Sequence, residues 1–305
     1  MHLLLLAAAA VAPLGLDPYM PVPADNPSTP AKIELGRRLF SDGRLSRDGS
    51  VSCATCHDPG RAFTDDRRVA HGIGHQEGTR RVPVLINRGY GTSFFWDGRA
   101  ASLEEQVLQP ILNPREMGMT VELTMSRVRE DRDYPHAFRT VFGRDVNARD
   151  LACALACYVR TIRSAGSPFD RYLAGEKGAL TSDQEAGAIL FSSKANCWFC
   201  HSGPNFTDEQ FHNTGIGRGR DDGRYAVTHN PGDHGAFKTP TLREVARTSP
   251  YMHDGSLDTL EDVVEHYDLG GAAELKPLHL TPAEKRALVA FLRALSGKIT
   301  QGNSE

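Results

Sequence analysis

The sequence contains the motif Cys-x-x-Cys-His twice, at residues 53–57 and 197–201. Each copy stands in the same surroundings. A Gly-x-x-Leu-Phe segment precedes it, at residues 36–40 and 187–191, and a Phe-Thr-Asp segment follows, at residues 63–65 and 206–208. No other feature constrains the fold as strongly, because an internal repeat means that one structural unit is present in two copies.

The repeated pattern continues beyond the motifs. Val82-Pro-Val-Leu matches Thr239-Pro-Thr-Leu, and Trp96-Asp-Gly matches His253-Asp-Gly. In both halves an acidic helix start follows, with Ser102 and Thr259 as the expected N-caps. We therefore predict two similar domains, residues 25–165 and 166–305, after a leader at residues 1–24.

Helical periodicity dominates the rest of the chain. Apolar residues recur at helical spacing over residues 148–163 and again over residues 282–295, whereas strand patterns are scarce. Gly and Pro number 29 and 18 of 305 residues, which favours long structured loops. The predicted fold is all-α, with long loops between its helices.

Cys-x-x-Cys-His is the attachment signature of c-type haem. Both thiols, Cys53 and Cys56 or Cys197 and Cys200, add to the haem vinyl groups, and His57 or His201 becomes the proximal iron ligand. The alternatives are a thioredoxin-like redox pair or half of a zinc site. A zinc site would join both cysteine pairs and leave the repeated histidine unexplained, so two covalently bound haems are predicted. The all-α fold is then expected to consist of two cytochrome c-like haem domains, related by the internal repeat and joined by long loops.

The remaining cysteines, Cys153 and Cys157, lie four residues apart in the helix expected over 148–163, a poor geometry for a disulfide. We interpret them as small buried residues, with a redox role as the alternative.

The N-terminal apolar run, residues 3–12, is too short to cross a membrane and matches the hydrophobic part of a secretory signal. Ala10-Val-Ala12 fits its cleavage pattern. Because c-type haem is attached outside the cytoplasm, the expected location is the periplasm. The formal net charge of −3, from 35 basic and 38 acidic residues, argues against nucleic acid as a partner.

The repeat allows the far sides of the two irons to be compared. Tyr267 lies 13 residues after Asp254, and the corresponding position after Asp97 is Pro110, which has no side-chain donor atom. If these positions face the irons, haem 1 is open to a small molecule such as peroxide and haem 2 carries a phenol oxygen. Glu116 follows as a candidate acid/base, although these residues alone favour a solvated surface charge at that position.

As a set, the motifs resemble the bacterial dihaem cytochrome c peroxidase and MauG superfamily across residues 35–295. The segments that carry the resemblance are Leu35-Gly-Arg-Arg-Leu-Phe40, Ser52-Cys-Ala-Thr-Cys-His57, Phe95-Trp-Asp-Gly-Arg-Ala100, Pro114-Arg-Glu-Met-Gly118, Phe211-His-Asn-Thr-Gly215 and Pro250-Tyr-Met-His-Asp-Gly255. The resemblance implies that haem 1 reacts with hydrogen peroxide. It implies that Gln106, Pro110 and the catalytic carboxylate Glu116 form the distal pocket, and that Trp96 relays electrons to haem 2.

Three departures from the family pattern bear on function. The conventional peroxidases have Met as the distal ligand of haem 2, whereas the matching residue here is Tyr267, as in MauG; Met252 is the rival ligand. His71 and His75 lie in the loop that caps haem 1 in conventional peroxidases, but neither aligns with the capping histidine. The family's interdomain calcium would use the carbonyls of Thr248 and Pro250, but Arg81 stands where an Asn ligand is expected.

The leading interpretation is a MauG-like enzyme that passes oxidising equivalents through Trp96 and haem 2 to a partner protein. The first alternative is a conventional peroxidase that takes electrons from a small cytochrome or cupredoxin. The second, of another class, is a dihaem electron carrier without catalysis. A hard phenolate ligand lowers the reduction potential of iron, whereas a Met thioether raises it.

Overall fold

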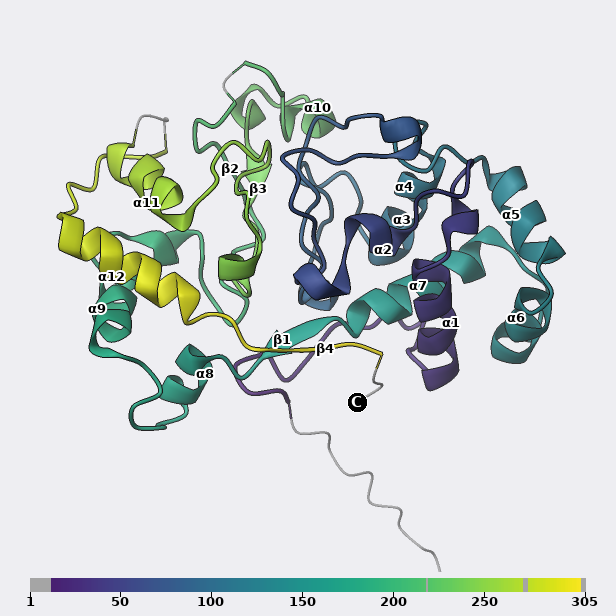
Figure 1. Ribbon diagram of the computed structural model, residues 1–305, viewed down its shortest axis with the longest axis horizontal. Coiled ribbons are helices and arrows are strands. Elements are labelled where there is room, and N and C mark those ends of the chain that lie inside the picture. The colour runs from purple at the N-terminus through teal and green to yellow at the C-terminus, as the bar shows by residue number, and fades with distance from the viewer. Residues whose placement is uncertain (1–11, 218, 271–273, 303–305) are drawn as a thin grey trace, which may run out of the picture.

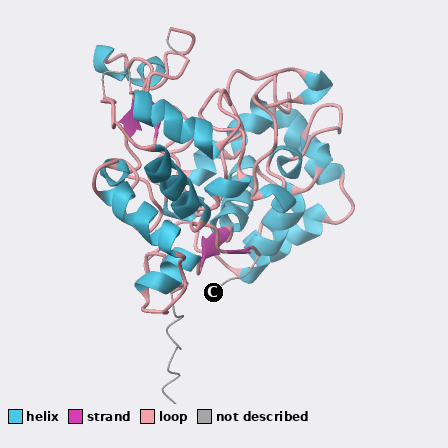
Figure 2. Ribbon diagram, turned by 60° about the vertical axis from the view of Figure 1, so that its left-hand side comes forward, coloured by secondary structure: helices cyan, strands magenta, loops and turns pink. Residues whose placement is uncertain are grey.

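The computed structural model describes residues 12–217, 219–270 and 274–302 (Figure 1). The chain is helix-rich with few strands, as the sequence predicts (Figure 2). The helices are α1 Pro30–Phe40, α2 Cys53–Cys56, α3 Leu103–Gln106, α4 Leu108–Leu112, α5 Val121–Glu130, α6 Tyr134–Phe142, α7 Ala148–Arg160, α8 Pro168–Leu173, α9 Ser182–Ser192, α10 Tyr225–Thr228, α11 Leu260–Leu269 and α12 Pro282–Arg293. Among these described helices, none combines the length and hydropathy that a membrane crossing requires.

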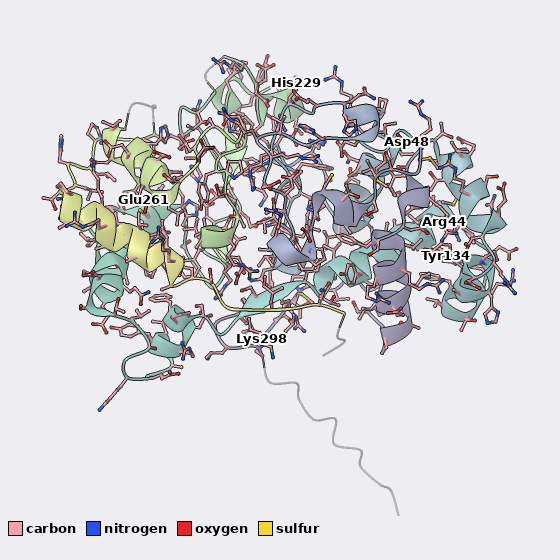
Figure 3. The ribbon with its side chains drawn as sticks, in the orientation of Figure 1. Arg44, Asp48, Tyr134, His229, Glu261 and Lys298 are labelled. Atoms are coloured by element: carbon pink, nitrogen blue, oxygen red, sulfur yellow. The ribbon has the colours of Figure 1, made fainter. Side chains whose placement is uncertain are left out.

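In the described parts of the chain, four short strands form two antiparallel pairs that periodicity did not predict. They are β1 Arg163–Ala165 with β4 Lys298–Thr300, and β2 Phe211–His212 with β3 Phe237–Lys238. The first pair brings the C-terminal segment back beneath the end of α7, as Figure 1 shows and as Lys298, labelled in Figure 3, marks. Ile299 then packs against the hydrophobic cluster of the first half.

Hydrophobic side chains gather in two clusters. One takes its buried residues from positions 33–162, and the other takes them from positions 191–295. In Figure 1 these halves lie side by side, with α1–α7 on the right, α8, α9, α11 and α12 on the left, and α10 at the top near the middle. The predicted boundary at residues 165/166 falls between the two clusters in sequence and stays a prediction.

One tight helix pair organises each cluster, α1 with α7 and α9 with α12. At each crossing a glycine meets the facing backbone: a Cβ on Gly36 would lie 2.0 Å from the Ala154 carbonyl oxygen, and one on Gly187 would lie 2.0 Å from that of Ala287. These are the glycines of the repeated Gly-x-x-Leu-Phe segments. They recur because the backbones approach too closely for any side chain.

The expected helix ends are in place. Ser102 Oγ accepts the Glu105 N–H at 3.1 Å and caps α3, and Thr259 Oγ1 accepts the Asp262 N–H at 3.0 Å and caps α11. The helix expected over 148–163 is α7, which ends at Arg160. Cys153 and Cys157 are buried within it and unpaired, at 6% and 0% exposure.

Part of the predicted leader lies against the body of the protein. Residues 1–11 fall outside the described residues, but Leu16 is buried, and the Leu14 carbonyl accepts the Gly166 N–H at 2.9 Å. The Gly15 carbonyl accepts a hydrogen bond from Arg243. Removing residues 1–24 would break these contacts, whereas cleavage after Ala12 would keep them.

A polar cluster ties the outer loop of the first half to α6. Tyr134 Oη donates to Asp42 Oδ2 at 2.8 Å, and the Arg44 guanidinium lies 5.3 Å from the Tyr134 ring centroid. Figure 3 shows Arg44 and Tyr134 close together at the right of the molecule, on the side of the first half that faces away from the second. These contacts stabilise the side of the first half that faces away from the second half.

Replacing Gly187 with Ala should lower the free energy of unfolding by about 1–3 kcal/mol, because the new methyl group overpacks the α9–α12 crossing. Urea denaturation of the holoprotein measures the loss. Ala186→Ser adds one atom on the exposed side of the same helix and should stay within about 0.5 kcal/mol of the wild type. Equal stability of Gly187→Ala and wild type would contradict the close approach.

Candidate functional site

The first Cys-x-x-Cys-His motif is a single turn of helix with the histidine at its end. Cys53 and Cys56 lie on α2, and the His57 N–H donates to the Cys53 carbonyl at 2.8 Å, which closes the turn. Ser52 begins it, with its N–H donating to Thr55 Oγ1 at 2.9 Å. This turn places both thiols and the imidazole on one side of a loop.

The second motif is a 3₁₀ turn with the same arrangement. The His201 N–H donates to the Cys197 carbonyl at 2.9 Å. Asn196, in left-handed conformation at φ 49°, leads into the turn. The two motifs therefore present the same chemical groups from slightly different helical turns.

Each motif histidine is held by a main-chain carbonyl. His57 Nδ1 lies 3.2 Å from the Phe63 carbonyl oxygen, and His201 Nδ1 lies 3.0 Å from that of Phe206. Since a carbonyl only accepts, Nδ1 carries the proton and Nε2 keeps its lone pair. Burial lowers the pKa of His57 to about 4 and also lowers the pKa of His201. Both imidazoles are thus neutral, as metal ligands must be.

One cavity of 670 Å³ joins the two motifs, and both histidines line it. Trp96, Gln106 and Tyr267 line it too, and most of its wall is apolar. Of the two thiol pairs, Cys197 and Cys200 line this cavity, whereas Cys53 and Cys56 reach it only through the adjacent His57. Two neutral imidazoles, each next to a thiol pair, and a mostly apolar cavity that joins them fit a pair of haem groups. The zinc alternative does not fit: among the described residues, the one set of ligand atoms close enough for a metal contains Cys200 but none of the other motif cysteines.

Trp96 is fixed by both halves of the chain. Its indole Nε1–H donates to the Arg81 carbonyl at 2.9 Å, and its own carbonyl accepts the Lys238 N–H at 2.8 Å. Its ring meets the His253 ring edge-on at a centroid distance of 6.5 Å, and His253 in turn stacks on Phe237 at 3.5 Å. The predicted relay residue is therefore a rigid part of the cavity wall.

The predicted distal residues of haem 1 are only partly brought together. Gln106 lines the cavity, whereas Pro110 and Glu116 do not. Pro110 lacks the N–H that would bond to the Gln106 carbonyl, and the helix is divided at Val107 into α3 and α4, with Pro110 inside α4. Glu116 is half-buried, and it lies on the side of the first motif, because burial chiefly and the Glu116 charge to a smaller extent raise the pKa of Cys53 and Cys56.

The residue that holds Glu116 was not predicted from the sequence. Asn113 Nδ2 donates to Glu116 Oε1 at 2.7 Å, while Asn113 Oδ1 accepts the Arg115 N–H at 3.0 Å and so orients the amide. Burial raises the pKa of Glu116, and the Asn113 hydrogen bond opposes that rise. The signal available in the sequence was Asn113 itself, which precedes Glu116 by three residues and carries an amide that can donate to the carboxylate.

Neither candidate capping histidine lines the cavity. The His71 ring pairs with Glu77 at 3.7 Å, and its carbonyl lies 3.8 Å from Cys56 Sγ. His75 is exposed. The loop is held in this arrangement by the Ile73 N–H, which donates to the Glu116 carbonyl at 2.8 Å.

Tyr267, near the end of α11, lines the cavity together with His201. Burial, with the nearby thiols of Cys197 and Cys200, raises its pKa above the ordinary value. Met252 lines the same cavity, so both predicted candidates for the distal position of haem 2 have access to it. The assignment to Tyr267 stays a prediction.

Arg81 occupies the place where calcium is implied. Its guanidinium donates to the carbonyls of Asp65 at 3.0 Å, Val82 at 3.2 Å and Ser249 at 3.2 Å. Ser249 stands between the two predicted carbonyl ligands, Thr248 and Pro250. A positive charge already bound to this segment repels a second one, and Ca²⁺ needs about 6–8 oxygen ligands. The residues present do not fit a calcium ion here.

Treatment of the holoprotein with the calcium chelator EGTA should therefore leave the absorption spectra of both haems unchanged. Spectrophotometry before and after dialysis checks this. Arg81→Asn restores the residue that the family pattern expects and is the matched variant for comparison. A spectral change in the wild type that added Ca²⁺ reverses would show that the site exists despite Arg81.

Known proteins resemble this chain over most of its length. The family model described as di-haem cytochrome c peroxidase matches residues 30–178. The chain is 44% identical to methylamine utilization protein MauG of Methylorubrum extorquens, over 92% of this chain and 82% of that protein. It is 38% identical to a cytochrome-c peroxidase of Denitromonas iodatirespirans, over 93% of this chain and 86% of that protein.

Among solved structures, a MauG-like protein associated with microbial copper homeostasis superposes with a TM-score of 0.85 at 33% identity. The match covers 93% of this chain and 95% of that one.

Proposed function

The chain belongs to the di-haem cytochrome c peroxidase and MauG family, and on that premise we propose that it passes the oxidising power of peroxide to a partner protein, as a MauG-like enzyme. Its membership makes it an oxidoreductase that acts on peroxide, so the electron-carrier alternative is set aside. The observation that carries the MauG-like assignment is Tyr267, whose phenol faces the same cavity as His201. A phenol oxygen in that position favours oxidised iron over reduced iron.

We infer that the two halves are copies of one module. Residues in left-handed conformation recur 157 positions apart, at Asn87 and Glu244, Phe95 and Met252, and Gly98 and Gly255. The isolated bridge between Phe94 and Ala100 likewise recurs between Tyr251 and Leu257. The same offset relates Pro110 to Tyr267, which supports placing both on the distal side of their irons.

Haem bound at each motif would supply the electrons for cleavage of the peroxide bond, with the Nε2 atoms of His57 and His201 as its iron ligands. The chain's own task at haem 1 is proton movement. Heterolysis of an O–O bond needs a proton shifted from one oxygen to the other, and an ionised Glu116 does this as base and then acid. The Asn113 amide holds the carboxylate in one orientation.

Trp96 is the residue suited to pass electrons between the two sites, because both halves hold it on the cavity wall. The partner then gives up electrons on the side of haem 2. Attachment of c-type haem and the N-terminal apolar run both support a periplasmic location for this chemistry.

A conventional peroxidase remains the second candidate, and one observation favours it. Met252 shares the cavity with Tyr267, and a Met thioether is the haem 2 ligand expected for that class. Steady-state turnover of reduced cytochrome c with peroxide would support it. A long-lived oxidised state after peroxide addition, without any donor, would support the MauG-like proposal.

Tyr267→Phe should change the absorption and EPR spectra of haem 2, because the variant lacks the phenol oxygen. Tyr251→Phe is the matched control, since the Tyr251 hydroxyl lines the same cavity but donates to the Val245 carbonyl at 3.1 Å. If Tyr267→Phe leaves the spectrum intact while Met252→Leu alters it, the ligand is Met252 and the proposal fails.

Glu116→Gln should slow the reaction with peroxide by about 10²–10⁴-fold, because the amide cannot accept the proton. In the wild type the rate should fall as the pH drops through a pKa above the ordinary value of 4.5, because burial raises that pKa and only the ionised form is a base. Stopped-flow measurement across pH checks both points.

Glu122→Gln is the control, an exposed carboxylate on the first turn of α5. It should keep the wild-type rate and its pH dependence. If Glu116→Gln retains the acid limb of the profile, the titrating group is another residue.

A further inference from the structure

Two buried basic residues stand at equivalent positions of the cavity wall. Arg81 and Lys238 are 5% and 7% exposed, both line the cavity, and 157 residues separate them. Each comes two residues before a proline, Pro83 or Pro240. Buried cations at corresponding places of both halves call for a common explanation, since burying a charge is unfavourable unless it is paired.

The segments that carry these cations lie next to the motif histidines. His57 and Pro83 line the cavity together, and so do His201 and Pro240. Each cation therefore lines the same cavity as the motif imidazole of its own half, two residues before a proline that lines it too. A group bound to that imidazole would share this cavity with the cation.

Arg81 has donors to spare. Its three hydrogen bonds all go to neutral main-chain carbonyls, and its buried Nε–H has no partner among the described residues. Asp65 acts on it electrostatically, but the Asp65 carboxylate makes no hydrogen bond to the guanidinium. The side chain thus brings a full positive charge to the cavity wall without a carboxylate partner.

Lys238 is only partly compensated. Its Nζ donates to Glu209 Oε1 at 3.2 Å, its one hydrogen-bond partner in the described parts of the chain. Glu209 also accepts two bonds from Arg88, at 2.8 and 3.1 Å. Two basic side chains share one carboxylate, and burial together with the Arg88 charge lowers the pKa of Lys238 to about 7. The Lys238 ammonium is therefore only partly compensated in this wall of the cavity, and it has three donors to place.

We propose that Arg81 and Lys238 each bind a propionate carboxylate of the haem attached in the same half. Haem is apolar on its faces and carries two carboxylates on one edge, so a mostly apolar cavity with one buried cation per half matches it. The inference rests on the proposed attachment of haem at both motifs. It does not depend on which distal ligand or which electron partner the enzyme uses.

The same two residues hold Trp96. The Arg81 carbonyl accepts the indole N–H, and the Lys238 N–H donates to the Trp96 carbonyl. Unpaired cations beside the indole would oppose the loss of an electron from it, because removing that electron creates a third positive charge nearby. A propionate carboxylate on each cation would offset this electrostatic opposition to oxidation of the indole. It would also connect the edge of each haem to Trp96 through Arg81 or Lys238.

The test uses the holoprotein variants Arg81→Met and Lys238→Met, which remove the charge and keep much of the volume. Resonance Raman spectra report the propionate bending bands of each haem, and a redox titration reports its Fe(III)/Fe(II) equilibrium. Arg81→Met should alter the bands of haem 1 and shift its equilibrium about tenfold toward Fe(III), and Lys238→Met should do so at haem 2.

Arg80→Met is the matched control. Arg80 is adjacent to Arg81, but its guanidinium is paired with Asp97 at 2.6 Å and with Asp221 at 2.7 Å, and it does not line the cavity. It should leave the bands of both haems unchanged. Arg81→Lys and Lys238→Arg should keep most of the wild-type signal.

Unchanged propionate bands and potentials in both Met variants would overturn the proposal. If Arg81→Met does not give folded holoprotein, Lys238→Met alone tests the proposal. The Lys238 substitution is the less disruptive one, because Lys238 Nζ bonds to a side chain, whereas Arg81 bonds to the main chain of Asp65 and Ser249. Neither measurement uses peroxide or a partner protein. Failure here therefore remains distinguishable from failure of the proposed function, which the peroxide reaction of the wild type tests.

Discussion

The chemistry at both motifs depends on one hydrogen bond, from the imidazole Nδ1 to a main-chain carbonyl. A bond of this kind contributes only about 0.5–1.5 kcal/mol to stability. Its effect on chemistry is larger, because it decides which ring nitrogen keeps a lone pair and which way the ring faces. The carbonyls belong to Phe63 and Phe206, both in left-handed conformation at φ 58° and 53°. The repeated Phe-Thr-Asp segment is thus what aims each histidine.

Much of this could be anticipated from the sequence, since the features concerned are local. The N-caps Ser102 and Thr259, the helix that became α7 and the buried state of Cys153 and Cys157 all follow from neighbours within a few residues. The repeat also directed attention to Tyr267. What escaped prediction depends on contacts between distant segments.

The two strand pairs show this limit well. They hold two or three residues each, too few for any alternation to stand out, and β1 meets β4 across about 135 residues. The partners of Arg81 are equally remote, since Ser249 lies on the other half of the chain. Asn113 lies close to Glu116 in sequence, but an Asn before a Pro is typical of a turn. Its hydrogen bond to Glu116 becomes evident only from the positions of the side chains.

The halves differ at one position in both backbone and side-chain chemistry. The helix that begins at Leu103 breaks before Pro110, whereas α11 runs unbroken from Leu260 to Leu269 and carries Tyr267. Proline has no side-chain donor atom, and it interrupts a helix because it lacks the N–H of a helical residue. Pro110 does not line the cavity, whereas Tyr267 does, and the open distal side of haem 1 stays a prediction.

The pairing of β1 with β4 sets an order of events during synthesis. Ile299 packs into the cluster of the first half, and the Gly302 N–H donates to Thr161 Oγ1 at 2.8 Å. The half of the chain that is translated first is therefore completed by residues that are translated last. Its packing at Thr161 and at the edge of its hydrophobic cluster is finished only when synthesis has reached residues 298–302.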